Sequence, residues 1–280
     1  MLRPSLDVKG RANWESAAAS WQHRPPISPA PEDMAWYEQA ARGGCVTNSP
    51  LRALLLGVTA EIATMDWPVR TNLVAVDWAE AMIKRVWPVA GLPPYAAVIR
   101  ADWFDMPLGE SSLDFVVGDG CYTALGSLDK ADTLNRAVSR VLRPGGRFAI
   151  RCISRSEESL DVDHLFDELL TGRHTDLGLF RWFLMMALQG EQRDGVRLDK
   201  LWRVWHERVP HPDEYIERFG WIPEEIANIE RYRVLDDSYV YPTIAELKEI
   251  AAPDFHIHQC DIPNYPHGQH FPRLILEKKM

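Results

Sequence analysis

The chain has 280 residues, of which 46% are hydrophobic and 25% charged, a composition typical of a globular protein. Its formal net charge of −9 argues against nucleic acid as a main partner, because phosphate binding requires a basic surface. The longest apolar stretch, residues 182–188, is too short to cross a bilayer, so no membrane partner is expected. The first twenty residues lack an apolar core and the four cysteines form no C-x-x-C pair, which predicts a cytoplasmic protein without a signal peptide.

Residues 1–50 are expected to form an N-terminal arm or lid. The proline cluster at residues 25–31 is incompatible with regular structure. Residues 32–42 then predict a helix, which ends at Gly43-Gly44 because glycine is favoured just beyond a helix.

The segment 51–154 alternates strand and helix patterns and predicts the core domain. Its apolar runs of strand length fall at residues 53–56, 73–76, 96–99, 113–117 and 147–153. Its helix-like segments fall at residues 60–65, 79–87 and 130–142. Such alternation predicts a parallel sheet covered on both faces, with residues 143–146 as the turn into the fifth strand.

From 155 to 240 the pattern changes to successive helices without strands, which predicts a helical cap inserted into the core. The expected helices are at residues 160–170, 176–189, 198–208 and 212–219. Segment 241–280 is expected to return to the core sheet. A capping box at residues 243–246 opens a helix to about residue 251, and strands follow at 255–260 and 273–278.

Three of the expected core strands end in a glycine or a carboxylate, namely Gly57, Asp77 and Asp102. In an open parallel sheet these ends lie along one edge, where ligands bind. Gly57 allows close approach of a ligand to backbone, Asp77 can accept bonds from a ribose diol, and Asp102 can accept from an exocyclic amine. The series therefore indicates a nucleoside site.

Four linked segments resemble the class I S-adenosylmethionine-dependent methyltransferases: residues 72–83, 99–108, 111–119 and 136–150. The resemblance implies a Rossmann-like, doubly wound, seven-stranded, mostly parallel sheet with S-adenosylmethionine as cofactor. It covers about residues 51–153 well, the last two strands loosely, and the cap not at all. One segment departs from the family pattern, because Gly57 is the only one of the three usual glycines after the first strand.

The resemblance implies roles for the first two strand ends. Gly57, Val58 and Thr59 would form the floor under the methionine and ribose, Asp77 would bind the ribose diol, and Trp78 would pack against the adenine. Taken alone, the carboxylate of Asp77 also fits an ordinary helix cap, and the tryptophan fits ordinary packing.

The third and fourth strand ends complete the expected site. Asp102 would accept from the adenine amine with Trp103 beside it, and Gly118 and Asp119 would lie next to the sulfonium and the acceptor. Both carboxylates also fit turn positions. Tyr37, on the helix before the first strand, either closes over the cofactor carboxylate or packs in the core.

Methyl transfer by this family needs alignment and exclusion of water, and needs a base only when the acceptor must lose a proton. Tyr122, Asp119 and His164 are candidate bases, and none is preferred, so the catalytic residues stay unknown. The Trp-rich arm and cap predict a small, apolar or aromatic acceptor. No Asn/Asp-Pro-Pro run follows the fourth strand, which argues against amino methylation of DNA bases.

Alternatives remain open at this point. A non-catalytic protein that binds S-adenosylmethionine or S-adenosylhomocysteine would share the fold. A nicotinamide-dependent oxidoreductase is disfavoured, because Glu61 would oppose a pyrophosphate at the first helix. An RNA methyltransferase is disfavoured by the acidic balance.

The C-terminal set His256, His258, Cys260, His267 and His270 lacks helical ligand spacing, so no metal is expected. The sequence does not indicate an oligomeric state.

Overall fold

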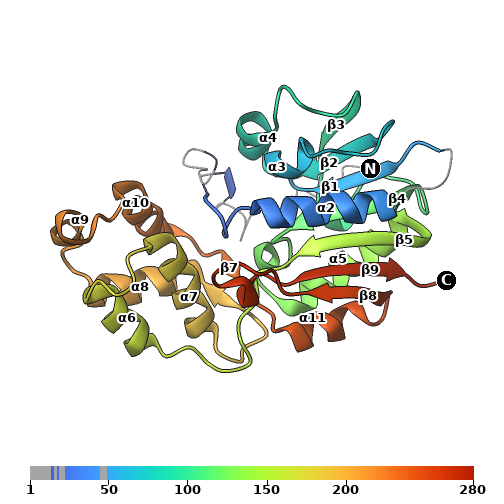
Figure 1. Ribbon diagram of the computed structural model, residues 1–280. Helices are drawn as coiled ribbons and strands as arrows, with labels where there is room; N and C mark the ends of the chain where they lie inside the picture. The colour runs from blue at the N-terminus through green and yellow to red at the C-terminus, as the bar shows by residue number, and fades with distance from the viewer. Residues whose placement is uncertain (1–13, 16–17, 19–22, 45–48) are drawn as a thin grey trace, which may run out of the picture.

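A seven-stranded sheet forms the centre of the computed structural model, which describes residues 14–15, 18, 23–44 and 49–280 (Figure 1). Its strands are β1 (Arg52–Leu56), β2 (Asn72–Asp77), β3 (Tyr95–Arg100), β4 (Leu113–Asp119), β5 (Leu142–Arg151), β8 (Phe255–Asp261) and β9 (Arg273–Lys278). Their order is β3-β2-β1-β4-β5-β9-β8, and β9 runs antiparallel to both of its neighbours. The predicted Rossmann-like, mostly parallel sheet is therefore confirmed.

Helices cover both faces of the sheet. The helices packed against it are α2 (Pro31–Gly43), α3 (Ala60–Ala63), α4 (Glu80–Val86), α5 (Leu128–Val141) and α11 (Ile244–Ala251). Side chains of α5 and α11 pack on one face, and those of α2 and α3 on the other. Alternate residues of β4 supply the two faces, since Val116 belongs to the first cluster and Phe115 and Val117 to the second. This alternation follows from the two-residue period of a strand.

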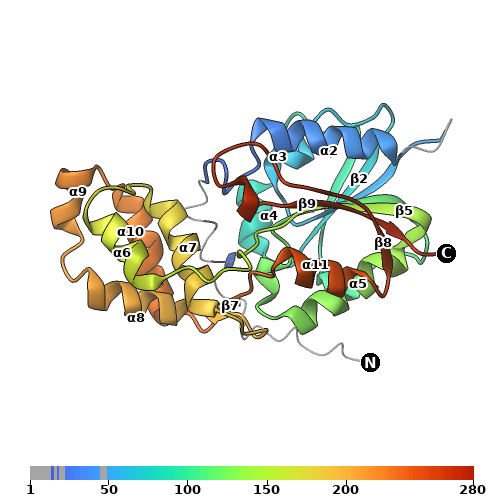
Figure 2. The same ribbon diagram turned by 60° about the horizontal axis from the view of Figure 1, so that its bottom comes forward.

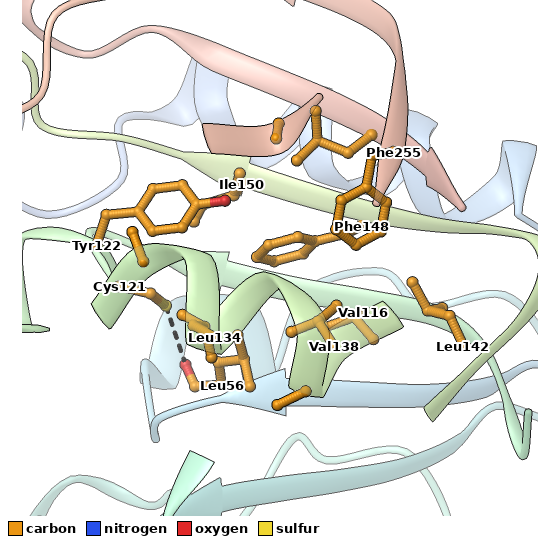
Figure 3. Close-up of a cluster of buried hydrophobic side chains, with 14 of the residues drawn as sticks. Leu56, Val116, Cys121, Tyr122, Leu134, Val138, Leu142, Phe148, Ile150 and Phe255 are labelled. Carbon is orange, nitrogen blue, oxygen red and sulfur yellow. Dashed lines mark hydrogen bonds between the residues drawn. The ribbon is translucent and has the colours of Figure 1, made fainter. Parts of the chain in front are cut away.

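The first of these clusters is closed by aromatic side chains from distant parts of the chain. Figure 3 shows Phe148 of β5 beside Phe255 of β8, above Leu134 and Val138 of α5. The rings of Phe148 and Phe255 have centroids 6.3 Å apart. The C-terminal strands are thus bound to the core through packing as well as through the β5–β9 ladder.

A second group of helices lies beyond the sheet, on the side where the parallel strands end (Figures 1 and 2). These helices are α6 (Val162–Leu170), α7 (Leu177–Gln189), α8 (Leu198–Arg208), α9 (Asp213–Phe219) and α10 (Pro223–Arg231). They share an apolar core of their own, centred on the fully buried Trp205. We call this group the cap.

Two expectations for the cap were incomplete. It contains a two-stranded antiparallel sheet, β6 (Val196–Arg197) and β7 (Ser238–Tyr239), where no strand was expected. Strands of two residues have no detectable alternation, so the sequence pattern could not indicate them. Helix α10 was also missed, although Pro223 at its start and the acidic Glu224 and Glu225 in its first turn are helix-start signals.

The Arg143–Gly146 segment also differs from expectation, because it lies inside β5 and does not precede it. Leu113 pairs with Leu142 and Phe115 with Arg147, so Asp114 alone faces the four intervening residues. The Asp114 carboxylate accepts hydrogen bonds from Arg143 Nε (2.7 Å) and Arg52 Nε (2.9 Å). These contacts stabilise the bulge from the neighbouring strands.

Of the expected N-terminal arm, residues 1–13, 16–17, 19–22 and 45–48 lie outside the described residues. The expected helix at residues 32–42 is α2, followed by Gly44 as its C-cap. Along the described part of the chain, none of the helices is long and apolar enough to span a membrane.

Candidate functional site

A cavity of about 340 Å³ lies where the carboxyl ends of the parallel strands face the cap. Its size is within the range of small-molecule sites. Eight of the nine predicted cofactor-binding residues line it, together with side chains of the cap. Seven of the eight are Gly57, Val58, Thr59, Asp77, Trp78, Asp102 and Trp103. Asp119 lines it too, whereas Gly118 does not.

Gly57 begins the loop between β1 and α3 with a φ of +87°, a conformation that glycine adopts without strain. Its N–H donates to Val76 O (2.8 Å), which holds the loop against β2. A Cβ at this position would lie 3.8 Å from Asp77 Oδ2 and 3.7 Å from Trp103 Cζ2. The loop therefore presents bare backbone between a carboxylate and an indole.

Asp77 combines a local structural role with a place on the cavity wall. Its Oδ1 accepts a hydrogen bond from Ala79 N–H (2.8 Å). Burial raises the pKa of this carboxyl group to about 6. The next two N–H groups, of Glu80 and Ala81, donate to the carboxylate of Glu15 at 2.9 Å each. Sequence reasoning missed Glu15, which joins the N-terminal segment to the start of α4.

The third strand end is organised in the same way. Asp102 accepts from Phe104 N–H (3.0 Å) and so caps the 3-10 turn Trp103–Asp105. Trp103 Nε1 donates to Val76 O (2.6 Å), which fixes its indole beside Gly57. Asp77 and Asp102 thus both have the local turn roles weighed from the sequence, and both still border the cavity. Cofactor contact stays a prediction for each.

The end of β4 differs from expectation, because Asp119 is held by a buried arginine. Arg151 Nε donates to Asp119 Oδ1 (2.6 Å) and Nη2 donates to Oδ2 (3.0 Å). Gly118 packs against Cys121, whose Sγ would lie 2.6 Å from an added Cβ, and its carbonyl accepts from Tyr37 OH (2.8 Å). Tyr37 is fully buried and does not line the cavity, so of its two expected positions it takes the core one.

Arg151 links this strand end to the N-terminal segment. Its Nη1 donates to Pro26 O (2.6 Å), and its Nη2 donates to Ile27 O (2.9 Å). The same Nη1 lies 3.6 Å from Asp33 Oδ2. Although burial opposes the charge, Asp119 and Asp33 hold the Arg151 pKa above its usual value. Sequence reasoning missed this residue. Its signal was one arginine at the end of an apolar strand, in register with Asp119 of the neighbouring strand.

The other two candidate bases lie away from the cavity. Tyr122 is buried in the cluster of Figure 3, where its hydroxyl donates to Asn135 Oδ1 (2.7 Å). His164 is exposed on α6, with Nε2 3.6 Å from Glu168 Oε1. Neither residue lines the cavity, and both oxygens of Asp119 accept from Arg151. None of the three candidate bases is therefore placed to take a proton from a molecule in the cavity. What the site can provide is a fixed position for that molecule and protection from water.

The C-terminal histidines do not form a cluster. His256 and His258 are exposed on the edge strand β8. His270 is buried, with Nδ1 3.0 Å from Ser154 O, and the His267 ring packs against Phe183. Within residues 14–15, 18, 23–44 and 49–280, no three His, Cys, Asp or Glu side chains are grouped as metal ligands.

The cap side of the cavity carries a different set of side chains, which the sequence pattern did not indicate. The rings of Trp182 and Tyr239 stack at 5.9 Å with an interplanar angle of 11°. Trp14 extends this aromatic wall, 6.1 Å from Tyr239. Arg181 and Arg231 line the same end. The sheet side of the cavity therefore carries four carboxylates and Lys130, whereas the cap side carries two arginines and no carboxylate among the lining residues.

Comparison with known proteins gives the core a family. Residues 54–150 match the family model described as "Methyltransferase domain". These residues include the loop after β1 and the carboxyl ends of β2, β3 and β4. A search of curated proteins gave no sequence match.

Solved structures share the fold at low identity. A 1,6-didemethyltoxoflavin-N1-methyltransferase from Burkholderia thailandensis, crystallised with 1,6-didemethyltoxoflavin and S-adenosylhomocysteine, has a TM-score of 0.53 at 14% identity, covering 100% of this chain and 93% of that one. A SAM dependent methyltransferase from Aquifex aeolicus gives 0.51 at 12%, covering 94% and 98%. A putative Zn-dependent alcohol dehydrogenase from Rhodobacter sphaeroides gives 0.59 at 10%, covering 95% and 99%. At such identities these likenesses establish the fold alone.

Proposed function

We propose that this chain, whose core is a class I S-adenosylmethionine-dependent methyltransferase domain, transfers a methyl group to a small molecule held beneath the cap. The observation that carries the proposal is the cavity that joins the strand ends of the matched domain to the aromatic wall of the cap. A site enclosed on both sides suits a small acceptor better than a polymer.

The residues at the sheet end fit S-adenosylmethionine. The bare backbone at Gly57 leaves room for a ligand between Asp77 and Trp103. The Asp77 carboxylate, buried and facing this gap, would accept from the ribose hydroxyls, and Asp102 from the adenine amine. Val58, Thr59 and Trp78 would complete the wall. Gly118 would act behind it, by allowing Cys121 to pack closely.

The cofactor, when bound, supplies a methyl carbon activated by a neighbouring positive sulfur. This chain's own contribution is to hold the acceptor in line and to exclude water. Arg151 fixes Asp119, so this carboxylate helps to shape the site and does not remove a proton. We therefore infer that the acceptor attacks through an atom that is already nucleophilic, such as a neutral amine or an ionised oxygen.

We also propose a division of the chain and a location. Residues 1–50 would form the arm, 51–154 the cofactor-binding core, 155–240 the cap, and 241–280 the end of the core. Cys121, Cys152 and Cys260 are free thiols, which supports a reducing, cytoplasmic compartment.

The test is transfer of labelled methyl from S-adenosylmethionine to a panel of small amines, phenols and carboxylates. Transfer to a panel member that saturates with its concentration supports the proposal. Binding of S-adenosylhomocysteine without transfer to any of them would favour the alternative, a non-catalytic binding protein. Transfer to RNA with no small-molecule acceptor would contradict the proposal.

A further inference from the structure

Arg181 is a buried cation that has no hydrogen bond to another described residue. It lies on α7 with its side chain only 5% exposed, and it lines the cap end of the cavity. Its nearest acidic partner, Glu225 Oε2, is 3.9 Å from Nη1, too far for a hydrogen bond. Its guanidinium lies 5.8 Å from the centre of the Tyr232 ring. A buried guanidinium without hydrogen bonds is costly unless a ligand supplies the acceptors.

Two further side chains at the same end have buried N–H donors without a hydrogen-bond partner among the residues that the structure describes. Arg231, which lines the cavity from the end of α10, has Nε and Nη1 buried without a partner. Trp182, next to Arg181 on α7, has its indole Nε1 buried without a partner. All three side chains belong to the cap, and none of the residues that the cap contributes to the lining is a carboxylate.

The charged side chains that line the cap end of the cavity are both positive. Burial, together with the charges of Arg181 and Arg231, lowers the pKa of His23 to about 4. His23 also lines the cavity, so at neutral pH it adds no charge there while both arginines remain positive. The cap carboxylate that faces Arg181 is Glu225, which lies outside the lining with Oε2 3.9 Å from Nη1. The acidic groups of the lining, Asp77, Asp102, Asp119 and Glu61, are on the sheet side.

We propose that the acceptor is a flat aromatic molecule carrying a carboxylate, which Arg181 and Arg231 bind while Trp182 and Tyr239 pack against its ring. A guanidinium matches a carboxylate with two parallel N–H donors, and such charge-assisted bonds are among the strongest available to a binding site. The stacked rings of Trp182 and Tyr239 provide the flat wall. This inference rests on the proposed function, because it names the molecule that would share the cavity with the cofactor.

The test is calorimetric titration of the protein saturated with S-adenosylhomocysteine. The probes are benzoate, 4-hydroxybenzoate and indole-3-carboxylate, each compared with its own carboxamide. The carboxylates should bind at least about tenfold more tightly than the carboxamides, because only a carboxylate offers a charged pair of oxygens to the two parallel N–H donors of a guanidinium. Arg181→Met should remove that preference while keeping most of the apolar volume. Arg203→Met, at an exposed cap arginine paired with Asp199, is the matched control and should leave the preference intact.

Each outcome separates the two proposals. Equal affinity of acids and amides, or no binding by any acid, overturns the carboxylate inference, as does an unchanged preference in Arg181→Met. S-adenosylhomocysteine affinity measured on the same variants shows whether the core remains folded. Should Arg181→Met not fold, Arg231→Gln and the comparison of probes on the unaltered protein still decide. If the unaltered protein did not bind S-adenosylhomocysteine at all, that result would contradict the proposed function itself.

Discussion

The sheet end and the cap end of the cavity are built in different ways. At the sheet end, Gly57, Asp77 and Asp102 lie where their strands end. Each carboxylate accepts a hydrogen bond from the N–H two residues further on, and the Gly57 N–H donates to Val76 of the neighbouring strand. At the cap end, Arg181, Tyr239 and Trp14 come from segments far apart in the sequence. A binding site made of the turns that follow the strands comes with the fold and can stay the same in proteins that share it. A site made of side chains from distant segments can differ from one protein to another and so can suit different substrates.

The largest effect is expected at Arg151, which lies behind the sheet end and holds Asp119. Arg151→Met should lower the free energy of unfolding by about 3–5 kcal/mol, because it leaves the Asp119 carboxylate without its buried cation and removes one of the two arginines that face Asp33. Arg147→Met is the matched control on the same face of β5. It breaks a half-exposed pair with Glu277 and should cost less than about 1 kcal/mol. Urea denaturation measures both, and equal losses would show that the buried Arg151 contributes no more to stability than a partly exposed ion pair does.

The next effect concerns the sheet end alone. Asp77→Asn keeps an acceptor for Ala79 N–H but removes the charge that the ribose hydroxyls would meet. S-adenosylhomocysteine affinity should fall by about 1–3 kcal/mol in calorimetry. The melting temperature should hold or rise, since an ionised carboxyl with a raised pKa destabilises the folded state at pH 7. Asp105→Asn, on the exposed side of the same edge, should change neither. A fall in melting temperature at constant affinity would make Asp77 a structural cap only.

A third prediction uses the raised pKa of Asp77. Its value of about 6 exceeds the ordinary value of 3.8, so the folded protein holds this proton more tightly than the unfolded chain. Its contribution to stability is therefore greatest below about pH 4 and is lost as pH rises towards 6. Cofactor affinity should behave oppositely, rising as the carboxyl ionises and levelling above about pH 7, with a fall of up to about tenfold per unit below pH 6. Asp77→Asn should flatten that profile, and a pH-dependence that persists in Asp77→Asn would assign it to another group.

The smallest effect is expected at a residue first considered as a base. Tyr122→Phe removes the hydroxyl that donates to Asn135 Oδ1, in the apolar cluster behind the site. Stability should fall by about 1 kcal/mol, and S-adenosylhomocysteine affinity should stay within about twofold. Calorimetry and denaturation on one preparation give both values. A tenfold loss of affinity would mean that Tyr122 reaches the cavity after all.

The same difference explains how far the sequence could be interpreted. The parallel strands and their ends were predicted because apolar runs closed by Gly57, Asp77 and Asp102 are local signals. The expected strand at 273–278 matches β9, and the expected capping box at Thr243 is present. Contacts made across the fold gave no such signal. The Arg151–Asp119 pair depends on strand register, and the wall of Trp182 and Tyr239 depends on how the cap folds back.

Calorimetric titration of the unaltered protein with S-adenosylmethionine and S-adenosylhomocysteine, with NAD as control, tests the central claim most directly. The arrangement of Gly57, Asp77 and Asp102 around the cavity predicts micromolar binding of the sulfur compounds and no binding of NAD. Binding of NAD, or of none of the three, would contradict it.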